Sequence, residues 1–471
     1  MNILVVSEAF VGGGLETHIH TYYQELCKDH NFTFAFGQFK NRLPIDKSIV
    51  HTGFNFKWES TIQEFIDDVE QLCDLIKKNQ IDIIHVHPFF SMYPALIASQ
   101  LTGVPIAMTY HGIASFSFSN RIIDTAWYYY GMYELFGKIF TVSNTGKKAL
   151  ERQFHRNDIS FLPNAVDLNQ YKQHTVMSNR KWAAISRLDA DNGKEEALTS
   201  LFNMLPELNI DHIDIYGDGS RKQALMDYVK AKNLTDRVTF KGFQTDLFDR
   251  LDNRYNGVIG TDRVAIEGLA MGYPVLEMGY GRAIGIIDTE MMKILRDTNF
   301  DANLMAQVSS ADALNQQLAE VYQNPEKFNM RNVIEKDFNI SSIGQAYLQE
   351  LKNTPFLPHA NVCEFYRELC LVNDKRENFF RGETVFNLMR KNVEYYAVSS
   401  DIKILFLLQQ MNMNTNNQMI NHVSGLNWRI DQCAVAIGKT IPSADVLNRP
   451  SFIRRVARKI KRIVKRILKG G

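Results

Sequence analysis

Short apolar runs alternate with longer segments of helical pattern in the first half of the chain. The strand-like runs lie at Ile3–Ser7, Phe32–Gly37, Asp82–His87, Pro105–His111, Lys138–Ser143 and Ile159–Pro163. The helix-length segments between them include Leu15–His30, Thr61–Asn79 and Asn144–Phe154. Apolar strands separated by helices predict a parallel sheet that is covered by helices on both faces.

A second series of the same kind follows a polar bridge at Asn169–Asn179. Its strand-like runs are Trp182–Ser186, His212–Tyr216, Arg237–Lys241, Gly257–Thr261 and Pro274–Met278, with helices expected from Lys194, Ser220 and Arg263. The predicted fold class is therefore α/β, with two doubly wound, Rossmann-like domains that face a cleft. We expect loops and helix N-termini at the carboxyl ends of both sheets to face a ligand.

The 471 residues divide into four predicted parts. Residues 1–170 and 171–354 form the two Rossmann-like domains. Residues 355–448 form a helical appendage, in which Thr384–Val398 and Ile402–Met413 are the clearest helices and no chemistry can be assigned. Residues 449–471 form a basic amphipathic helix.

Several classes of protein are excluded by composition. The five cysteines are scattered without a Cys-x-x-Cys pair, which argues against a zinc site or a disulfide framework. The N-terminal apolar run is too short for a secretion signal, and a run of about 18 apolar residues does not occur. We therefore expect reduced cytosol as the setting. No cofactor is expected either.

The C-terminal segment 452–469 holds nine Lys or Arg and no acid, whereas the whole chain has a net charge of only +1. Its apolar residues recur at helical spacing at Ile453, Val456, Ile460, Ile463, Val464 and Ile467. An apolar stripe flanked by cations is typical of a helix that lies on an anionic membrane. Nucleic acid is the competing partner of a basic run, but the stripe and the lack of other basic patches favour a membrane.

Glycines and cations stand at the ends of several predicted strands. Gly12, Gly13 and Gly14 follow the first strand and precede a helix, where free N–H groups favour a phosphate. In the second series, Arg187 leaves a strand and Lys194 reaches a helix N-terminus. A forked guanidinium and a compact ammonium could hold a diphosphate and stabilise it as a leaving group.

One carboxylate, Glu267, lies in a short helix of small and apolar residues that is expected to begin after Thr261 or Asp262 as the N-cap. Near the cleft, such a carboxylate is a good acceptor for vicinal hydroxyls such as those of a ribose. A solvated helix residue is the other interpretation. Gly217 and Gly242 stand in tight turns after two further strands, and these turns also fit ordinary turn chemistry.

Taken in order, these motifs resemble the GT-B glycosyltransferases of family 4 over roughly residues 1–350. The motifs are Gly12–His18, His111-Gly112, Val142–Thr145, Leu162–Leu168, Ser186–Leu188, Gly217–Gly219, Val238–Gly242 and Glu267–Val275.

The resemblance implies a retaining transfer of a sugar from a nucleotide diphosphate donor, without a metal. It implies that Arg187 and Lys194 hold the diphosphate and that Glu267 binds the ribose. It places His111 beside the donor sugar, and Gly12–Gly14 where acceptor and phosphate meet.

Two features depart from the family pattern. A second glutamate, expected near the donor sugar, is replaced by Ile259. We expect Asp262 or Arg263 to replace that contact, and the segment Gly279–Gly285 to bring backbone N–H groups to the phosphates. Lys194 also lies two residues farther from its arginine than is usual in the family.

A metal site is a competing interpretation of Asp189-Ala-Asp191, because paired carboxylates suit a divalent cation. Asp-x-Asp belongs to the other large glycosyltransferase fold, so no metal is expected in this context. For His85 and His87 we favour packing or hydrogen bonding.

The sequence thus predicts a hexosyltransferase of polysaccharide or lipid-linked acceptors, held at the cytosolic membrane face by its last helix. The aromatic segment Phe116–Phe136 could border the acceptor or touch lipid, although an aromatic helix is more often core. A degenerate partner subunit of another glycosyltransferase and a nucleic-acid-associated protein are the alternatives. Homo-oligomerisation stays open.

Overall fold

A computed structural model describes residues 1–392 except 41, 88–89, 113–134, 155, 176, 178, 191–192, 245–246, 248–250, 252–253, 280–281, 302–309 and 381. The predicted helices at Ile402–Met413 and 449–471 therefore lie outside the described residues. So do Asp191 and most of the aromatic segment Phe116–Phe136. Within the described residues, no helix is long and apolar enough to span a membrane.

The first domain is built on a parallel sheet with the strand order β3-β2-β1-β4-β5-β6-β7. Its strands are β1 (Asn2–Phe10), β2 (Asn31–Phe39), β3 (Val50–Thr52), β4 (Ile83–His87), β5 (Ile106–Tyr110), β6 (Lys138–Thr141) and β7 (Ser160–Phe161). All six strands predicted for this domain are present, and the short edge strand β3 is an addition. Edge position and a length of three residues explain why periodicity did not reveal β3.

Both faces of this sheet are buried. Successive side chains of β1 point to opposite faces, and each set packs into a separate core. Ile3 and Val5 pack into one core with helix α1 (Gly14–Leu26). Leu4 and Val6 pack into the other core with α2 (Ile62–Lys78) and α3 (Met92–Thr102). The helix α5 (Asn144–Phe154) precedes β7. The apolar strands therefore belong to a doubly wound domain, as the alternation predicted.

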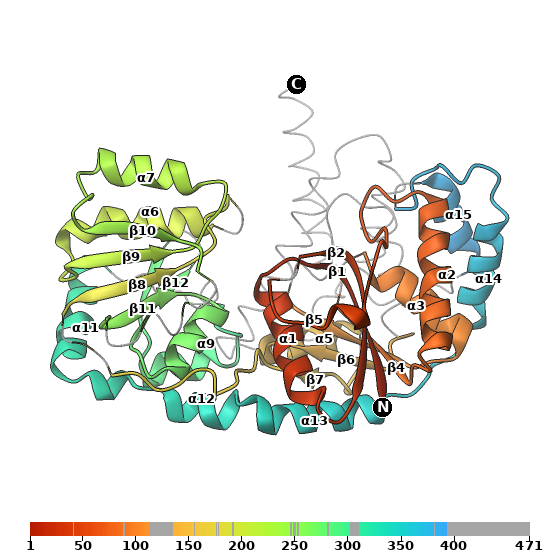
Figure 1. Ribbon diagram of the computed structural model, residues 1–471, viewed down its shortest axis with the longest axis horizontal. Helices are drawn as coiled ribbons and strands as arrows, with labels where there is room; N and C mark the ends of the chain where they lie inside the picture. The colour runs from red at the N-terminus through yellow and green to blue at the C-terminus, as the bar shows by residue number, and fades with distance from the viewer. Residues whose placement is uncertain are drawn as a thin grey trace, which may run out of the picture.

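The second domain repeats this plan with the strand order β10-β9-β8-β11-β12-β13. Its strands are β8 (Lys181–Ile185), β9 (His212–Tyr216), β10 (Val238–Gly242), β11 (Gly257–Gly260), β12 (Val275–Gly279) and β13 (Arg282–Ile286). Its helices include α6 (Lys194–Met204), α7 (Lys222–Ala231), α9 (Arg263–Ala270), α10 (Thr289–Leu295), α11 (Ala311–Gln323) and α12 (Arg331–Asp337). The domain lies beside the first one in Figure 1.

The segment Gly279–Gly285 is in part a strand. We expected it to bring backbone N–H groups to the phosphates. Residues 282–286 instead form β13, which pairs antiparallel with β12, and Leu276 lies opposite Ile286. The backbone groups of this part of the segment thus serve the sheet ladder at its edge.

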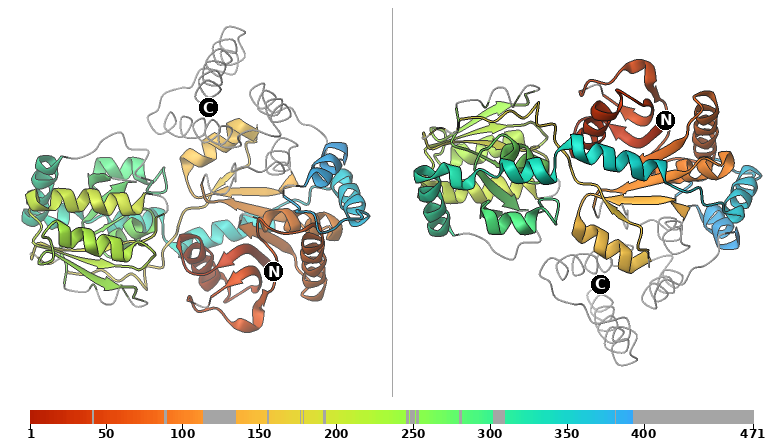
Figure 2. Two further views of the ribbon diagram at one scale, coloured as in Figure 1. Left: turned by 90° about the horizontal axis from the view of Figure 1, so that it is seen from above. Right: turned by 90° about the horizontal axis from the view of Figure 1, so that it is seen from below.

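Two chain crossings connect the domains. The backbone N–H of Val166 donates to Phe338 O at 2.9 Å, and that of Ile340 donates to Val166 O at 3.0 Å. Beyond this bridge, α13 (Ile340–Lys352) packs against α1 of the first domain. Figures 1 and 2 show α13 along the base of that domain. The last helix of the predicted segment 171–354 therefore contributes to the first domain's core through Tyr347, Leu348 and Leu351.

The described part of the appendage also packs on the first domain. Its helices are α14 (Ala360–Cys370) and α15 (Glu383–Asn392), which lie beside α2 and α3 in Figure 1. Between them, Phe379 is fully buried and stacks on Phe65 of α2 with ring centroids 3.5 Å apart. The segment thus extends the first domain's core instead of forming a separate unit.

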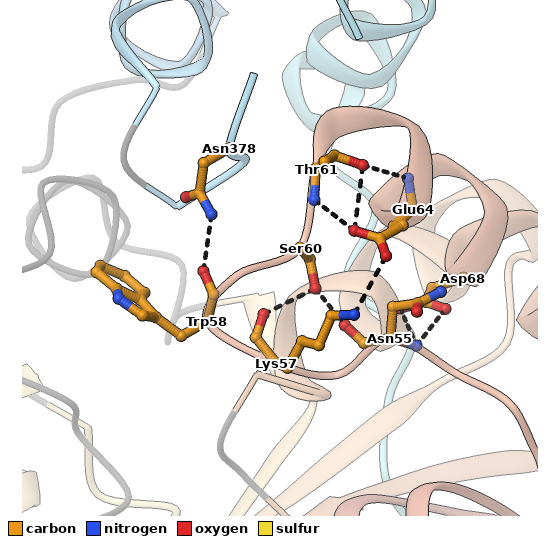
Figure 3. A network of polar contacts seen from close by, with 8 residues as sticks. All are labelled: Asn55, Lys57, Trp58, Ser60, Thr61, Glu64, Asp68 and Asn378. Carbon is orange, nitrogen blue, oxygen red and sulfur yellow. Dashed lines mark hydrogen bonds and ion pairs between the residues drawn. The ribbon is translucent and has the colours of Figure 1, made fainter. Parts of the chain in front are cut away.

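Two hydrogen bonds to backbone carbonyls strengthen this attachment. Phe379 N donates to Ser60 O at 2.8 Å, and Asn378 Nδ2 donates to Trp58 O at 2.9 Å (Figure 3). The loop that receives these bonds is itself held by the capping box of α2, in which Thr61 and Glu64 bond each other reciprocally.

Candidate active site

The first domain contributes a glycine-rich loop at the carboxyl end of β1. Gly12 has φ +102°, a left-handed conformation that favours glycine, and α1 begins immediately afterwards. The carboxylate of Glu16 turns back and accepts from Val11 N at 3.3 Å. A Cβ added to Gly13 would lie only 2.9 Å from that carboxylate. These glycines therefore allow β1 to enter a helix N-terminus by a short, tight path.

Four histidines gather beside this loop, at the ends of β4 and β5 and on α1. The ring of His18 meets that of His111 edge-on, with centroids 5.0 Å apart. His87 Nδ1 and His111 Nε2 share a hydrogen bond of 2.9 Å. His85 is bonded to Thr109 Oγ1 at 2.7 Å and to the hydroxyl of Tyr347. His85 and His87 are thus hydrogen-bonded inside the domain, as predicted.

Burial keeps this cluster uncharged. Desolvation lowers the pKa of His85 and of His111 to about 3, with His111 also lowering that of His85. It likewise lowers the pKa of His18 and of His87 well below the usual value. At neutral pH the rings can thus exchange hydrogen bonds without repelling one another.

His18 has a defined tautomer. Its Nδ1 lies 3.0 Å from Asn164 Oδ1, and Asn164 Nδ2 donates to Asn299 Oδ1 of the second domain at 2.9 Å. Since Asn164 Oδ1 can only accept, Nδ1 carries the proton and Nε2 keeps a lone pair. That buried Nε2 has no hydrogen-bond partner among the described residues. The sequence analysis named His18 only as the end of a motif.

The second domain contributes three loops that pack on one another. The loop after β8 carries Arg187, and its Leu188 N donates to Asp218 O at 3.0 Å. Gly217 has φ +147°, and a Cβ there would lie 1.8 Å from Ser186 O. Gly217 N donates to Gly242 O at 3.1 Å. The close approach of these backbones by itself requires glycine at 217, so Gly217 has a structural role at the site edge.

Asp262 lies within electrostatic reach of both predicted phosphate-binding cations. Burial raises the pKa of its carboxyl to about 6, Lys194 and Arg187 lower it, and Asp301 raises it. Asp262 is the N-cap residue of α9, one of the two predicted positions, with φ 54° and ψ −126°, but its side chain makes no capping hydrogen bond. A non-glycine residue in that conformation is strained, and such strain concentrates at functional sites.

The position of the missing glutamate is explained by the fold. Ile259 is 1% exposed and packs in the core beneath α6, so its side chain belongs to the domain interior. Only two residues separate the end of β11 from α9. This short turn places the Asp262 carboxyl within electrostatic reach of Arg187 and Lys194. A small cavity lies alongside, lined in part by Lys194, Ile259, Thr261 and Gly279, so the uncharged Ile259 side chain stands beside it.

Glu267 lies on the buried side of α9. Its Oε1 accepts from Tyr171 OH at 2.9 Å and from Arg263 Nε at 2.8 Å. Burial raises the pKa of Glu267, while Arg263 and Tyr171 lower it. Its Oε2 receives no hydrogen bond from a described residue, so one oxygen remains for a ligand hydroxyl. Arg263 also donates from Nη2 to Thr21 Oγ1 of the first domain at 2.9 Å.

Asp189, the first acid of the Asp-x-Asp segment, holds a turn of the second domain in place. Asp189 Oδ1 accepts from Ser220 N at 2.8 Å and from Ser220 Oγ at 3.0 Å, and thus holds the turn before α7. Among the residues that the structure describes, no group of three His, Cys, Asp or Glu is arranged to bind a metal.

Two further residues at the site were not predicted. Tyr171 reaches Glu267 from the connection between the domains, and Glu277 lies fully buried in β12. A lone acid in the apolar strand Val275–Gly279 is a signal that sequence reasoning could have used, because buried carboxyls mark functional sites.

The candidate site consists of two groups of residues. The first domain contributes a histidine cluster and a glycine-rich loop, and the second domain contributes cations and acids. Residues 12–170 match the model of Glycosyltransferase Family 4. This match lies within the first domain and covers less than half of the chain. It supports the family 4 resemblance that the motifs indicated. No curated protein matches the chain.

Solved structures confirm the GT-B fold. Sucrose-phosphate synthase from Thermosynechococcus elongatus is 15% identical, with a TM-score of 0.57 over 74% of this chain and 98% of that one. HepE from Anabaena in complex with UDP is 16% identical, with a TM-score of 0.55 over 75% and 100%. The lipopolysaccharide outer core galactosyltransferase WaaB is 16% identical, with a TM-score of 0.51 over 74% and 99%.

Proposed function

We propose that the chain is a retaining, metal-independent glycosyltransferase that uses a nucleotide diphosphate sugar. The observation that carries the proposal is the convergence of Arg187, Lys194 and Asp262 at the carboxyl edge of the second sheet. The two cations suit a diphosphate, and Asp262 suits the hydroxyls of the attached sugar. Similar structures support this donor class, because HepE was solved with UDP and glucose and the pneumococcal transferase GtfA with UDP and GlcNAc.

The remaining residues fit around such a donor. The free oxygen of Glu267 would accept a ribose hydroxyl, and the neutral ring of His111 would face the sugar from the first domain. The helix N-terminus after Gly12–Gly14 would supply N–H groups where the acceptor meets the phosphate. We propose a front-face substitution in which Arg187, Lys194 and this helix stabilise the departing diphosphate.

Calorimetry with UDP, GDP, ADP, CDP and dTDP, and then with their sugars, tests the donor site. Arg187→Ala should weaken binding of the preferred nucleotide about 10- to 150-fold, since a hydrogen bond to a charged group contributes about 1.5–3 kcal/mol. Arg367→Ala removes an exposed arginine of α14 that pairs with Glu364, and it should leave binding unchanged. Absence of binding to all these nucleotides would support the degenerate-subunit alternative.

We also propose that the enzyme works at the cytosolic membrane face on a carbohydrate or lipid-linked acceptor. The support is the cationic amphipathic segment 452–469 in the sequence. Removal of residues 449–471 should abolish sedimentation with vesicles that contain phosphatidylglycerol, at equal donor affinity. Retained vesicle binding would refute the anchor, and tighter binding to DNA than to vesicles would favour the nucleic-acid interpretation.

A further inference from the structure

Glu277 is an acid inside a core strand at the edge of the candidate donor site. It lies in β12, opposite Gly260 of β11, and its side chain is 0% exposed. Neither carboxyl oxygen makes a hydrogen bond of normal geometry to any described residue. A buried polar group without a partner is unfavourable, so a well-packed apolar residue would serve the fold better.

The surroundings of Glu277 lead to the donor site. Burial raises the pKa of Glu277 well above its usual value, and Asp262 and Asp301 raise it further, although the Thr261 hydroxyl lowers it. Its burial beside these acids thus favours the uncharged form of the carboxyl. Asp262, its neighbour, interacts in turn with Lys194 and Arg187.

A protonated carboxyl has one O–H donor and one carbonyl acceptor side by side. A sugar hydroxyl has the complementary pair, because it both donates and accepts. A phosphate oxygen at neutral pH only accepts, so it would use half of this capacity. A neutral acid also avoids repulsion with a diphosphate held by Arg187 and Lys194.

We propose that Glu277 is a donor-contacting residue whose carboxyl exchanges two hydrogen bonds with a hydroxyl of the transferred sugar and thereby helps to select that sugar. This inference rests on the proposed function. It assigns a contact from β12 in addition to that of Asp262, and the two acids would then hold different hydroxyls of one sugar.

The test compares Glu277→Gln with Glu277→Leu and Glu277→Met in the full chain. A glutamine amide still donates and accepts, whereas leucine and methionine do neither. We expect the apolar variants to lose at least about tenfold in affinity for the preferred nucleotide sugar, such as UDP-glucose, but less than about twofold for the diphosphate alone. The Gln variant should keep the affinity for the nucleotide sugar within about threefold, because both hydrogen bonds can re-form.

The other outcomes distinguish a failure of the role of Glu277 from a failure of the proposed function. Equal losses for UDP and UDP-glucose, or no loss for either, would overturn the role of Glu277 and leave the donor site intact. Should the Leu variant fail to fold, the Met variant, matched more closely in shape, carries the same comparison. If the wild type binds no nucleotide or nucleotide sugar at all, the proposed function fails first and this inference with it.

Discussion

Arg263 of the second domain donates from Nη2 to Thr21 Oγ1 of the first domain at 2.9 Å, across 242 residues of sequence. The same guanidinium holds Glu267, the candidate ribose ligand, through Nε. One buried side chain thus joins the two domains and positions a residue of the donor site. Arg263 is one of the two predicted sugar contacts, and its buried Nη1 has no hydrogen-bond partner among the described residues.

Arg263→Ala should destabilise the protein by about 3 kcal/mol, because it leaves the buried carboxylate of Glu267 without its cation. Thr21→Val is the matched control, which removes the hydroxyl that accepts from Arg263 and donates to Thr17 O at 2.7 Å, and it should cost about 1 kcal/mol. Urea-induced unfolding measures both. Equal effects of the two variants would show that the interdomain bond, rather than the ion pair, dominates.

The backbone strain at Asp262 can be separated from the chemistry of its carboxyl. Asp262→Gly and Asp262→Asn both remove the charge, but only glycine relieves the conformation at φ 54° and ψ −126°. The Gly variant should therefore be about 1 kcal/mol more stable than the Asn variant, while both lose donor turnover. Thermal unfolding and nucleotide release give the two readouts, and equal stability of both variants would contradict stored strain.

The histidine cluster should make the protein sensitive to acid. The unfolded chain binds protons at its histidines below about pH 6.5, whereas the folded state does not until about pH 3 at His85. Stability from His85 is therefore fully present above about pH 6.5, and it is lost progressively as the pH falls. The raised pKa values of Asp68, Asp262, Glu267 and Glu277 act in the opposite sense, so total stability alone does not reveal this effect.

A difference measurement isolates the contribution of His85. From pH 6.5 to pH 5, the wild type should lose about 1.7 kcal/mol in total relative to His85→Gln, because the unfolded histidine is about half protonated at pH 6.5 and almost fully protonated at pH 5. Thr109→Val removes the hydroxyl partner but keeps the titrating ring, so its pH slope should match that of the wild type. Parallel slopes for the wild type and the Gln variant would show that His85 is protonated in the folded state.

The docking of the appendage should depend on Phe379. Phe379→Ala removes a fully buried ring that stacks on Phe65, and it should cost about 3–5 kcal/mol. Leu371→Ala, in the same segment but 80% exposed, should change stability by less than about 0.5 kcal/mol. Thermal unfolding together with limited proteolysis of residues 355–392 tests this. A small effect of Phe379→Ala would mean that the backbone bonds to Ser60 and Trp58 suffice.

Local patterns were enough to predict the helices and strands that carry the site. The predicted segment Thr61–Asn79 matches α2, because Thr61 is its N-cap residue and Asn79 its C-cap residue. The short strands β3 and β13 escaped because each is an edge element whose pairing partner, not its own pattern, makes it a strand. β13 is a strand because its backbone pairs antiparallel with β12, the strand before it in the sequence.

The sequence by itself determined the two doubly wound domains and the places where their loops carry glycine, cations and acid, because these follow from periodicity and turn chemistry within short windows. Only the tertiary structure decided that the Asp262 carboxyl interacts with Arg187 and Lys194, that Arg263 bridges to Thr21, and that Glu277 is buried without a hydrogen-bond partner among the described residues. Such relationships depend on the burial of side chains and on contacts between distant segments. A short stretch of sequence contains neither the desolvation nor the distant partner residue on which these relationships depend.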